Sequence, residues 1–372
     1  MDLQSLQTPA IVVRESIMLA NLKRYQQECS NHGKQLWPML KTHKSTLIAA
    51  LQKELGASGF LCGTLDECEA LCRAGLTPLM YAYPLAGEVS CDRAAALAEA
   101  CTFYARIDTL EGARQLNEAA KKRGVTIRYT VILDCGLHRF GLPAEEILPF
   151  VQALQLLEHL DFWGISTHCG HVYAESDPAK VPLYAEQERE SVRLACKSLQ
   201  QAGFAVRLVT SGATPTFRHT LADEHIGVYH PGNYIFHDAI QLSNGTACEA
   251  DCALLVCATV ISAPRRGTLI CDAGAKCLGL DQGAHGNSSL RGHGHVVGHP
   301  EITVTALSEE VGKLAVEGET DLQVGDRILI IPNHACSAAN LTAQYFLLDD
   351  ENRVTGTIPV DIRSNSTNKG TL

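Results

Sequence analysis

A lysine that closes an apolar segment is the first feature of this chain that suggests covalent chemistry. Lys41 follows the segment Gln35–Leu40, and a second lysine, Lys44, comes soon after it. A buried amine has a lowered pKa, so it can act both as a nucleophile and as a base. Opposite an anion-binding loop, Lys41 would hold an aldehyde cofactor as an imine. Spacing alone favours a simpler interpretation, in which the lysine reaches solvent.

Two loops rich in glycine and hydroxyl groups could bind a phosphate. The loop Ser211–Thr216 reads Ser-Gly-Ala-Thr-Pro-Thr, and the loop His230–Tyr234 reads His-Pro-Gly-Asn-Tyr. Backbone N–H groups in such loops can surround an anion. One loop of this kind is usually an ordinary turn. Two such loops, each following a predicted strand of the barrel described below, indicate an anion site.

Three polar residues in two further loops could contact a bound cofactor or substrate. Arg139 lies in the segment Asp134–Gly141, whereas His171 and Tyr173 follow a later apolar segment. Arg139 could hold a pyridine nitrogen or a carboxylate. His171 and Tyr173 could stack on a ring or hydrogen-bond to it. Each of these residues, taken alone, is more typical of a solvated loop.

A histidine and a cysteine near the carboxyl end have a spacing that suits a metal site. His334 and Cys336 follow the apolar segment Arg327–Ile331 and are two residues apart, so both side chains lie on one side of an extended chain. Imidazole nitrogen and thiolate sulfur together favour zinc, with water completing the coordination shell. Without other support, a chance pair is the simpler interpretation.

Short apolar segments alternate with helix-like segments over much of the chain, and this pattern predicts a parallel sheet wound with helices. The predicted strands are Gln35–Leu40, Gly59–Cys62, Leu79–Ala82, Thr102–Ile107, Ile127–Leu133, Phe162–Thr167, Val206–Thr210 and Ile226–Tyr229. The helices include Met18–His32, Leu65–Ala74, Leu110–Arg123, Ala144–Leu157 and Tyr184–Ala202. Eight strand–helix units predict a (β/α)₈ barrel, whose active site lies at the carboxyl ends of the strands.

After Asp238 the pattern changes to short strands separated by Gly, Pro and Asn. The strands expected there are Leu254–Ile261, Thr268–Cys271, Glu301–Ala306, Arg327–Ile331 and Gln344–Leu348. They predict a separate β domain, which the strand Ala10–Val13 would join. The polar tail Ser364–Leu372 is expected to be disordered.

The composition is that of an ordinary globular protein with a surplus of acidic residues. The 372 residues carry a formal net charge of −10, which argues against a nucleic-acid partner. Neither a secretory leader nor a membrane-spanning apolar segment is evident, so we expect a cytoplasmic protein. The 15 cysteines include no CxxC pair, and all except the candidate metal ligand Cys336 are expected to be reduced thiols.

Taken together, the motifs resemble the D-serine dehydratase and D-threonine aldolase family of fold-type III pyridoxal-phosphate enzymes. The segment Trp37–Lys44 is similar to the imine-lysine motif of that family, and Ser211–Thr216 and His230–Phe236 are similar to its phosphate-binding segments. The patterns Asp-x-Gly-x-x-Arg-x-Gly and Asp-Ala-Gly match Asp134–Gly141 and Asp272–Gly274. The resemblance covers nearly the whole chain.

The resemblance implies an alanine-racemase-like fold with a (β/α)₈ barrel over residues 14–242 and a β domain built from residues 1–13 and 243–372. It implies pyridoxal 5'-phosphate on Lys41, a homodimer, and zinc or another divalent metal on His334 and Cys336. Besides Lys41, the implied cofactor-binding residues are Arg139, His171, Tyr173, Ser211, Gly212, Ala213, Thr214, Gly232, Asn233 and Tyr234.

The metal motif favours a lyase of the D-serine dehydratase type, because the aldolases of the family carry His and Asp at the two ligand positions. The expected reaction converts a small D-β-hydroxy amino acid such as D-serine into pyruvate and ammonia. The alternatives are a metal-dependent D-threonine aldolase, an amino-acid racemase and a non-catalytic pyridoxal-phosphate carrier. Trp37, Met39 and Val311 stand where the family has polar residues, so the substrate or the reaction could differ from that of the known members.

Overall fold

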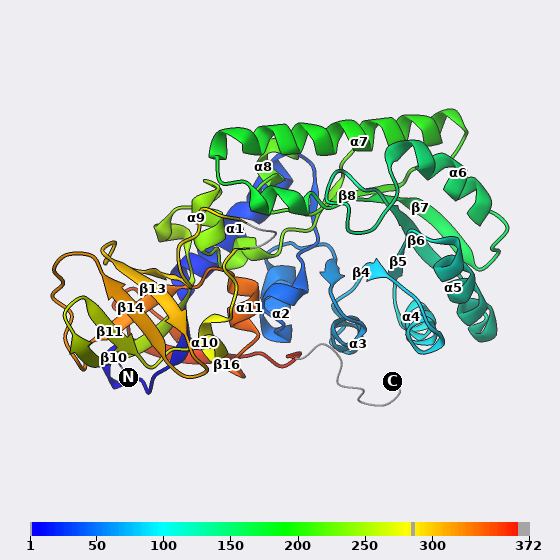
Figure 1. The fold of residues 1–372 in the computed structure, drawn as a ribbon. Coiled ribbons are helices and arrows are strands. Elements are labelled where there is room, and N and C mark those ends of the chain that lie inside the picture. The colour runs from blue at the N-terminus through cyan, green and yellow to red at the C-terminus, as the bar shows by residue number, and fades with distance from the viewer. Residues whose placement is uncertain (1, 284–286, 364–372) are drawn as a thin grey trace.

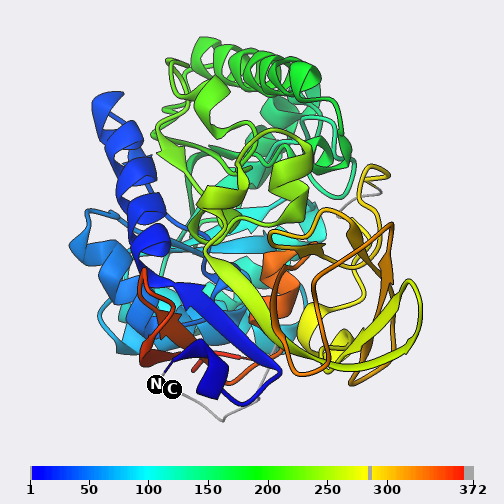
Figure 2. The same ribbon diagram turned by 90° about the vertical axis from the view of Figure 1, so that its left-hand side faces the viewer.

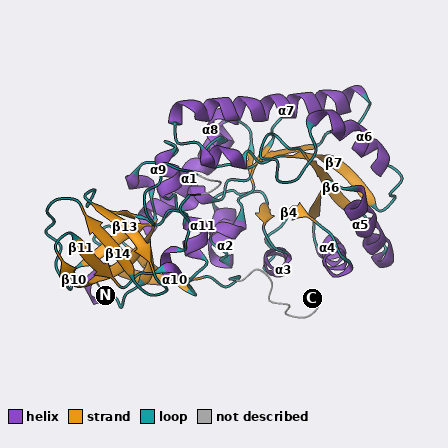
Figure 3. Cartoon of the chain, in the orientation of Figure 1, coloured by secondary structure: helices purple, strands orange, loops and turns teal. Residues whose placement is uncertain are grey.

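The computed structural model describes residues 2–283 and 287–363, which form two β-sheets side by side (Figure 1). One sheet is parallel and is wrapped by helices. The other sheet is largely antiparallel and carries few helices, as the colouring by secondary structure shows (Figure 3). The two patterns expected from the sequence are therefore both present.

The parallel sheet contains eight strands in the order β2-β9-β8-β7-β6-β5-β4-β3. They are β2 (Gln35–Leu36), β3 (Phe60–Cys62), β4 (Leu79–Pro84), β5 (Phe103–Ile107), β6 (Ile127–Ile132), β7 (Leu160–Ser166), β8 (Leu208–Ser211) and β9 (Val228–Tyr229). Each overlaps a predicted strand. Just after β2, Met39 forms an isolated parallel bridge with Leu61 of β3, so the two edge strands are joined there. Every residue of β5 is buried, as expected of a parallel strand covered on both faces.

Helices cover the outer face of this sheet (Figure 1). They are α1 (Glu15–Asn31), α2 (Thr46–Glu54), α3 (Leu65–Arg73), α4 (Glu88–Ala100), α5 (Leu110–Arg123), α6 (Ala144–Leu154), α7 (Val181–Gln201) and α8 (Phe217–Thr220). Helix α5 illustrates why they form. Thr109 Oγ1 accepts the N–H of Gly112 at 3.2 Å and caps the start, and Gly124 ends the helix with a φ of 67°. Leu116 and Ala120 are buried against the sheet.

The second sheet has nine strands in the order β11-β14-β13-β12-β15-β10-β1-β16-β17, and β10 pairs with β11 as well. The strands are β1 (Ala10–Arg14), β10 (Leu254–Arg265), β11 (Thr268–Cys271), β12 (His295–Val296), β13 (Ile302–Leu307), β14 (Gly312–Val316), β15 (Arg327–Ile331), β16 (Gln344–Leu348) and β17 (Val354–Pro359). The pairing of β10 with β11 closes six of them into a ring. The expectation that Ala10–Val13 joins this sheet is confirmed, whereas β12, β14 and β17 were not predicted.

The second sheet reaches the first through its helix α11 (Ala335–Ala339), which contacts the turn Leu40–Thr42 after β2. Asn340 Nδ2 donates a hydrogen bond to the carbonyl of Lys41 at 3.1 Å. Tyr345 Oη donates to the carbonyl of His43 at 2.8 Å. Figure 2 shows β1, in blue, lying within the second sheet before α1 leaves it. The carboxyl-terminal part of the chain thus holds the lysine turn.

A search of the helices in the described residues finds none that combines the length and the hydrophobicity of a membrane span. All fifteen cysteines lie in the described residues, and none of them forms a disulfide there. The tail Ser364–Leu372, predicted to be disordered, lies outside the described residues.

Candidate active site

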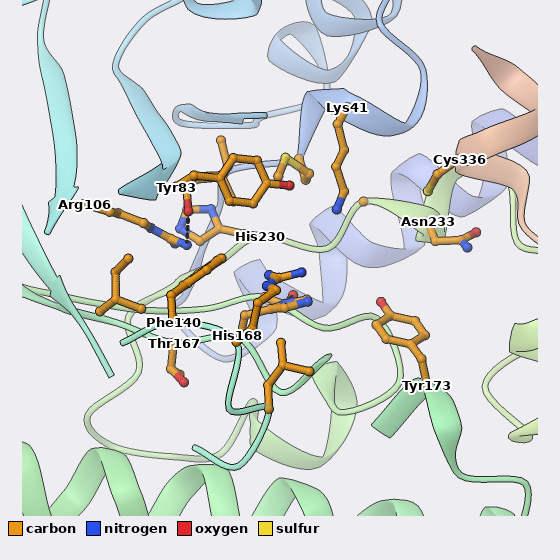
Figure 4. Close-up of a pocket in the computed structure, with 18 of the residues that line it drawn as sticks. Lys41, Tyr83, Arg106, Phe140, Thr167, His168, Tyr173, His230, Asn233 and Cys336 are labelled. Atoms are coloured by element: carbon orange, nitrogen blue, oxygen red, sulfur yellow. Dashed lines mark hydrogen bonds between the residues drawn. The ribbon is translucent and has the colours of Figure 1, made fainter. Parts of the chain in front are cut away.

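A cavity opens at the carboxyl ends of the parallel strands and extends to helix α11 (Figure 4). The turns after β2, β6, β7, β8 and β9 contribute to its walls, as does the turn that leads into α11. Predicted site residues that line it are Lys41, Arg139, Tyr173, Gly212, Gly232, Asn233, His334 and Cys336. Residues from distant parts of the sequence therefore meet in one cavity.

The two lysines after β2 have different surroundings. The side chain of Lys41 points into the cavity (Figure 4). Lys44 is only 4 % exposed, and its ammonium group lies 3.1 Å from the carboxylate of Glu67, which is fully buried. A Cβ at Gly63 would lie 3.1 Å from Lys41 Cβ, so glycine leaves room for the lysine. Lys41 is the lysine that a cofactor in this cavity would meet.

The loops after β8 and β9 approach the cavity with little side-chain bulk. A Cβ at Gly212 would lie 3.0 Å from His230 Cβ, and a Cβ at Gly232 would lie 2.7 Å from Thr42 Oγ1, so neither position has room for a larger residue. The hydroxyl of Thr214 is buried and has no hydrogen-bond partner among the described residues. A hydroxyl in loops with little side-chain bulk fits the oxygen atoms of a phosphate group.

Three predicted residues of the loop after β8, which are Ser211, Ala213 and Thr214, do not line the cavity. Ser211 Oγ donates a hydrogen bond to the carboxylate of Glu188 on α7 at 2.8 Å. Ala213 packs in a small apolar cluster with Cys135 and Cys169. Burial raises the pKa of Glu188 to about 7, against the lowering effect of its hydrogen bonds from Ser211 and Thr216. Ser211 and Ala213 therefore anchor the loop to its neighbours and do not face the cavity.

Two aromatic residues predicted to contact the cofactor also lie outside the cavity lining. Tyr234 accepts a hydrogen bond from Gln52 Nε2 at 3.0 Å, and its ring centroid lies 4.7 Å from that of Tyr25. His171 Nε2 lies 3.3 Å from Gln187 Oε1 on α7. Their side chains pack against helices instead.

Tyr173 and Arg139 lie on the cavity wall, as expected. The hydroxyl of Tyr173 accepts the backbone N–H of Thr214 at 3.1 Å, which links the loop after β7 to the loop after β8. The guanidinium of Arg139 lies 4.5 Å from the centroid of the Phe140 ring, a distance at which the ring attracts the cation. Arg139 thus presents an exposed positive charge to the cavity.

His334 and Cys336 lie together at the start of α11. Thr42 Oγ1 is 3.2 Å from Cys336 Sγ, and His334 Nδ1 is 3.5 Å from Asp281 Oδ1. Burial acts to raise the pKa of Cys336, but the charge of His334 and its hydrogen bond outweigh burial and lower that pKa. Burial acts to lower the pKa of His334, but the interaction with Cys336 outweighs burial and raises that pKa.

This donor set fits a zinc ion. In the described part of the chain, no group of three or more His, Cys, Asp or Glu residues could hold a metal. A metal on His334 and Cys336 would therefore keep positions for water or substrate. Asp281, which faces Nδ1 of His334, is placed as an outer carboxylate that orients the ring, so that Nε2 is available to the metal.

A buried arginine in the cavity was missed by the sequence analysis. Arg106 on β5 is 4 % exposed and lines the cavity. Within residues 2–283 and 287–363, its guanidinium donates to neutral acceptors, which are Met80 Sδ at 3.3 Å, the Ala82 carbonyl at 3.5 Å and Thr210 Oγ1 at 3.2 Å. Burial lowers its pKa to about 9. The available signal was an arginine inside the otherwise apolar segment Phe103–Ile107.

His230 also lines the cavity, although it was noted only as part of a loop. Its Nδ1 lies 2.9 Å from the carbonyl of Trp37. A carbonyl only accepts, so Nδ1 carries the proton, and Nε2 has no partner among the described residues. Burial lowers the pKa of His230 to about 3, which keeps the ring neutral at physiological pH.

Comparison with known families identifies both parts of the chain. The profile of the alanine racemase N-terminal domain matches residues 13–239, and that of a serine dehydratase domain matches residues 253–348. The D-threo-3-hydroxyaspartate dehydratase of Delftia sp. (strain HT23) is 30% identical over 351 residues, which cover 90% of this chain and 92% of that protein. The D-serine dehydratase of Dictyostelium discoideum is 27% identical and covers 95% of this chain and 96% of that protein.

Solved structures agree with this assignment. D-threo-3-hydroxyaspartate dehydratase from Delftia sp. HT23 superimposes with a TM-score of 0.90 at 29% identity, covering 98% of this chain and 99% of that chain. A D-threonine aldolase from Filomicrobium marinum gives a TM-score of 0.89 at 25% identity, covering 98% and 97%. A cysteine-to-alanine mutant of D-threo-3-hydroxyaspartate dehydratase has been solved in the metal-free form, with a TM-score of 0.90 at 29% identity, covering 98% and 100%.

Proposed function

Because this chain belongs to the alanine racemase N-terminal domain family and continues into a serine dehydratase domain, we propose that it is a pyridoxal-phosphate- and zinc-dependent dehydratase of D-β-hydroxy amino acids such as D-serine. One observation carries this proposal. Lys41 and the pair His334 and Cys336, contributed by different sheets, line the same cavity. A proton acceptor and a metal site can therefore act on adjacent carbon atoms of one substrate.

Lys41 is the central group in the proposed reaction. When bound, pyridoxal phosphate would supply an electron sink for charge at Cα, and zinc would supply a Lewis acid for the β-hydroxyl. Nζ of Lys41 would hold the cofactor through its aldehyde carbon until the substrate amine displaces it, and the freed amine would accept the α-proton of the substrate. Lys44 is unsuited to either task, because Glu67 pairs with it in a buried site.

The remaining residues bind and orient. The loops at Gly212–Ala213 and Gly232–Asn233 would hold the phosphate through backbone N–H groups, and Thr214 would add its hydroxyl. The exposed guanidinium of Arg139 would bind the substrate carboxylate. His334 and Cys336 would hold the metal, with Asp281 orienting the imidazole and Thr42 contacting the sulfur.

The same proposal includes the finer architecture. The bridge between Met39 and Leu61 supports closure of the parallel sheet into a (β/α)₈ barrel. Residues 14–242 would form this barrel, and residues 1–13 and 243–372 the β domain, which is consistent with the sheet membership of β1 and β2. We further propose a cytoplasmic homodimer.

Product analysis tests the reaction. Purified protein, with and without a chelator, should be assayed with D-serine, D-threonine and their L-enantiomers. We expect pyruvate and ammonia from D-serine, with loss of both after chelation. Glycine plus acetaldehyde from D-threonine would instead establish an aldolase, and interconversion of enantiomers would establish a racemase. A protein that binds pyridoxal phosphate but converts no substrate would be a carrier.

A further inference from the structure

One buried carboxylate contacts both halves of the candidate active site. Asp238 is completely shielded from solvent. Its Oδ2 accepts hydrogen bonds from Asn233 Nδ2 at 2.5 Å and from the backbone N–H of Ala335 at 2.8 Å. Asn233 belongs to the loop after β9, and Ala335 separates His334 from Cys336. A single oxygen atom therefore bridges the proposed phosphate loop and the proposed metal ligands.

The other oxygen of Asp238 has a separate, structural role. Oδ1 accepts the backbone N–H of Gln241 at 3.1 Å and caps the short helix α9 (Ala239–Ser243). Capping is what an aspartate at the start of a helix ordinarily does. The bridge and the cap thus use different atoms, and a substitution can remove one without the other.

We propose that Asp238 is a positioning residue that couples the two ligands, so that pyridoxal phosphate and zinc each tighten the binding of the other. This inference rests on the proposed function, because it assumes that both groups bind in this cavity. An occupied phosphate loop restrains Asn233, and Asn233 restrains the carboxylate of Asp238. The carboxylate in turn restrains the N–H group between the two metal ligands, so the ordering needed for the second ligand has already taken place.

Burial makes this link stiff. A carboxylate without solvent loses much stabilisation when a donor moves away, so a shift of either turn is opposed by the other. A weaker second link runs through Asn340, whose Nδ2 donates to the carbonyls of Lys41 at 3.1 Å and Cys336 at 2.7 Å. Some coupling should therefore survive the loss of Asp238.

Three variants separate the bridge from the cap. Asp238→Ser keeps a hydroxyl that can cap α9 but is too short to reach both Asn233 and Ala335. Asp238→Asn can keep one oxygen on the bridge while its NH₂ group loses the cap. The control is Asp223→Asn, because Asp223 is also buried and accepts backbone N–H groups, at His225 and Ile226, yet contacts neither half of the site.

Calorimetric titration of Zn²⁺ into the apo and pyridoxal-phosphate-loaded protein measures the coupling without turnover. For the wild type we expect about tenfold tighter zinc binding in the loaded form, and by linkage the same factor for pyridoxal phosphate when zinc is present. In Asp238→Ser the factor should fall to about threefold or less, whereas Asp238→Asn and Asp223→Asn should keep it.

Two results would overturn the proposal: equal zinc affinity in both forms of the wild type, or full coupling in Asp238→Ser. Loss of coupling in Asp238→Asn alone would assign the effect to the cap and would also overturn it. If Asp238→Ser does not fold, Asn233→Ala removes the bridge from its other end and should lose the coupling. Failure of the proposed function is distinguishable, because zinc would then bind neither form in a manner that depends on Cys336.

Discussion

The loops at the carboxyl ends of the parallel strands, called the rim below, and the turn before α11 contribute to the same cavity in different ways. On the rim, polar groups are held by buried partners, such as the hydrogen bond from the N–H of Thr214 to Tyr173 Oη. In the turn, the side chain of His334 is 27% exposed and Cys336 is only partly buried, and the charge of each side chain stabilises that of the other. The rim is therefore held largely by hydrogen bonds within the protein, whereas a metal ion has to replace a charge pair in the turn. This difference implies that cofactor and metal functions can be removed separately.

The largest effect should come from Lys41. We expect Lys41→Ala to lower kcat by about 10⁴-fold or more, because both the covalent attachment and the proton acceptor are lost. Zinc content, measured by metal analysis at saturating Zn²⁺, should remain near that of the wild type. Borohydride reduction of the wild type followed by peptide mapping should find the pyridoxyl label on Lys41. A label on Lys44 would show that the rim is organised differently from this account.

Removal of a metal ligand should have the next largest effect. In Cys336→Ala, oxo-acid production should fall by about 1000-fold, because hydroxide is a poor leaving group without a Lewis acid. The protein should still bind pyridoxal phosphate, and the α-proton of the substrate should still exchange with solvent, as followed by NMR. Full turnover in this variant would remove the distinction between rim and turn.

The buried carboxyl of Glu188 makes the free energy of unfolding depend on pH. The pKa of Glu188 is raised by burial from 4.5 to about 7. Its stabilising contribution is therefore fully present below pH 4.5 and is lost as the pH rises through 7, by on the order of 3 kcal/mol. Glu188→Gln should flatten this part of the pH dependence, as measured by urea unfolding at several pH values. Glu186→Gln, a change at an exposed position of the same helix, should leave it unaltered.

The smallest effect distinguishes two hydroxyls of one loop. Thr214→Val should weaken pyridoxal-phosphate binding by about tenfold, the loss of one hydrogen bond to a charged group. Ser211→Ala should leave that affinity unchanged and lower the free energy of unfolding by about 1 kcal/mol, because the hydroxyl of Ser211 donates its hydrogen bond to Glu188. Fluorescence titration and thermal unfolding measure the two quantities. The opposite pattern would place the phosphate nearer to Ser211.

Much of this architecture was predictable because apolar segments identify strands whatever their partners are. All eight strands of the parallel sheet were found in this way, and strand ends indicated the loops at which side chains meet. The strands β12, β14 and β17 were missed. β12 is only two residues long, and β17 is largely exposed, so neither shows a clear apolar pattern.

Side-chain direction was harder to predict than position. A parallel strand is buried on both faces, so its sequence does not reveal that Arg106 points into the cavity. The loop residues Ser211 and Tyr234 suit a phosphate site by type, but partners from distant helices, Glu188 and Gln52, hold them elsewhere. The sequence around Ser211 or Tyr234 does not reveal these partners, because they lie far away along the chain.

Strand β1 pairs with strands that are synthesised much later than β1 itself. Ala10 pairs with Cys257 of β10, and Val12 pairs with Phe346 of β16. At a synthesis rate of about 5–20 residues per second, the first strand waits roughly 12–50 s on the ribosome for its first partner. An unpaired apolar strand attracts other chains during such a delay. We therefore expect the yield of folded protein in a cell to respond to translation speed and to chaperones that cover the amino terminus.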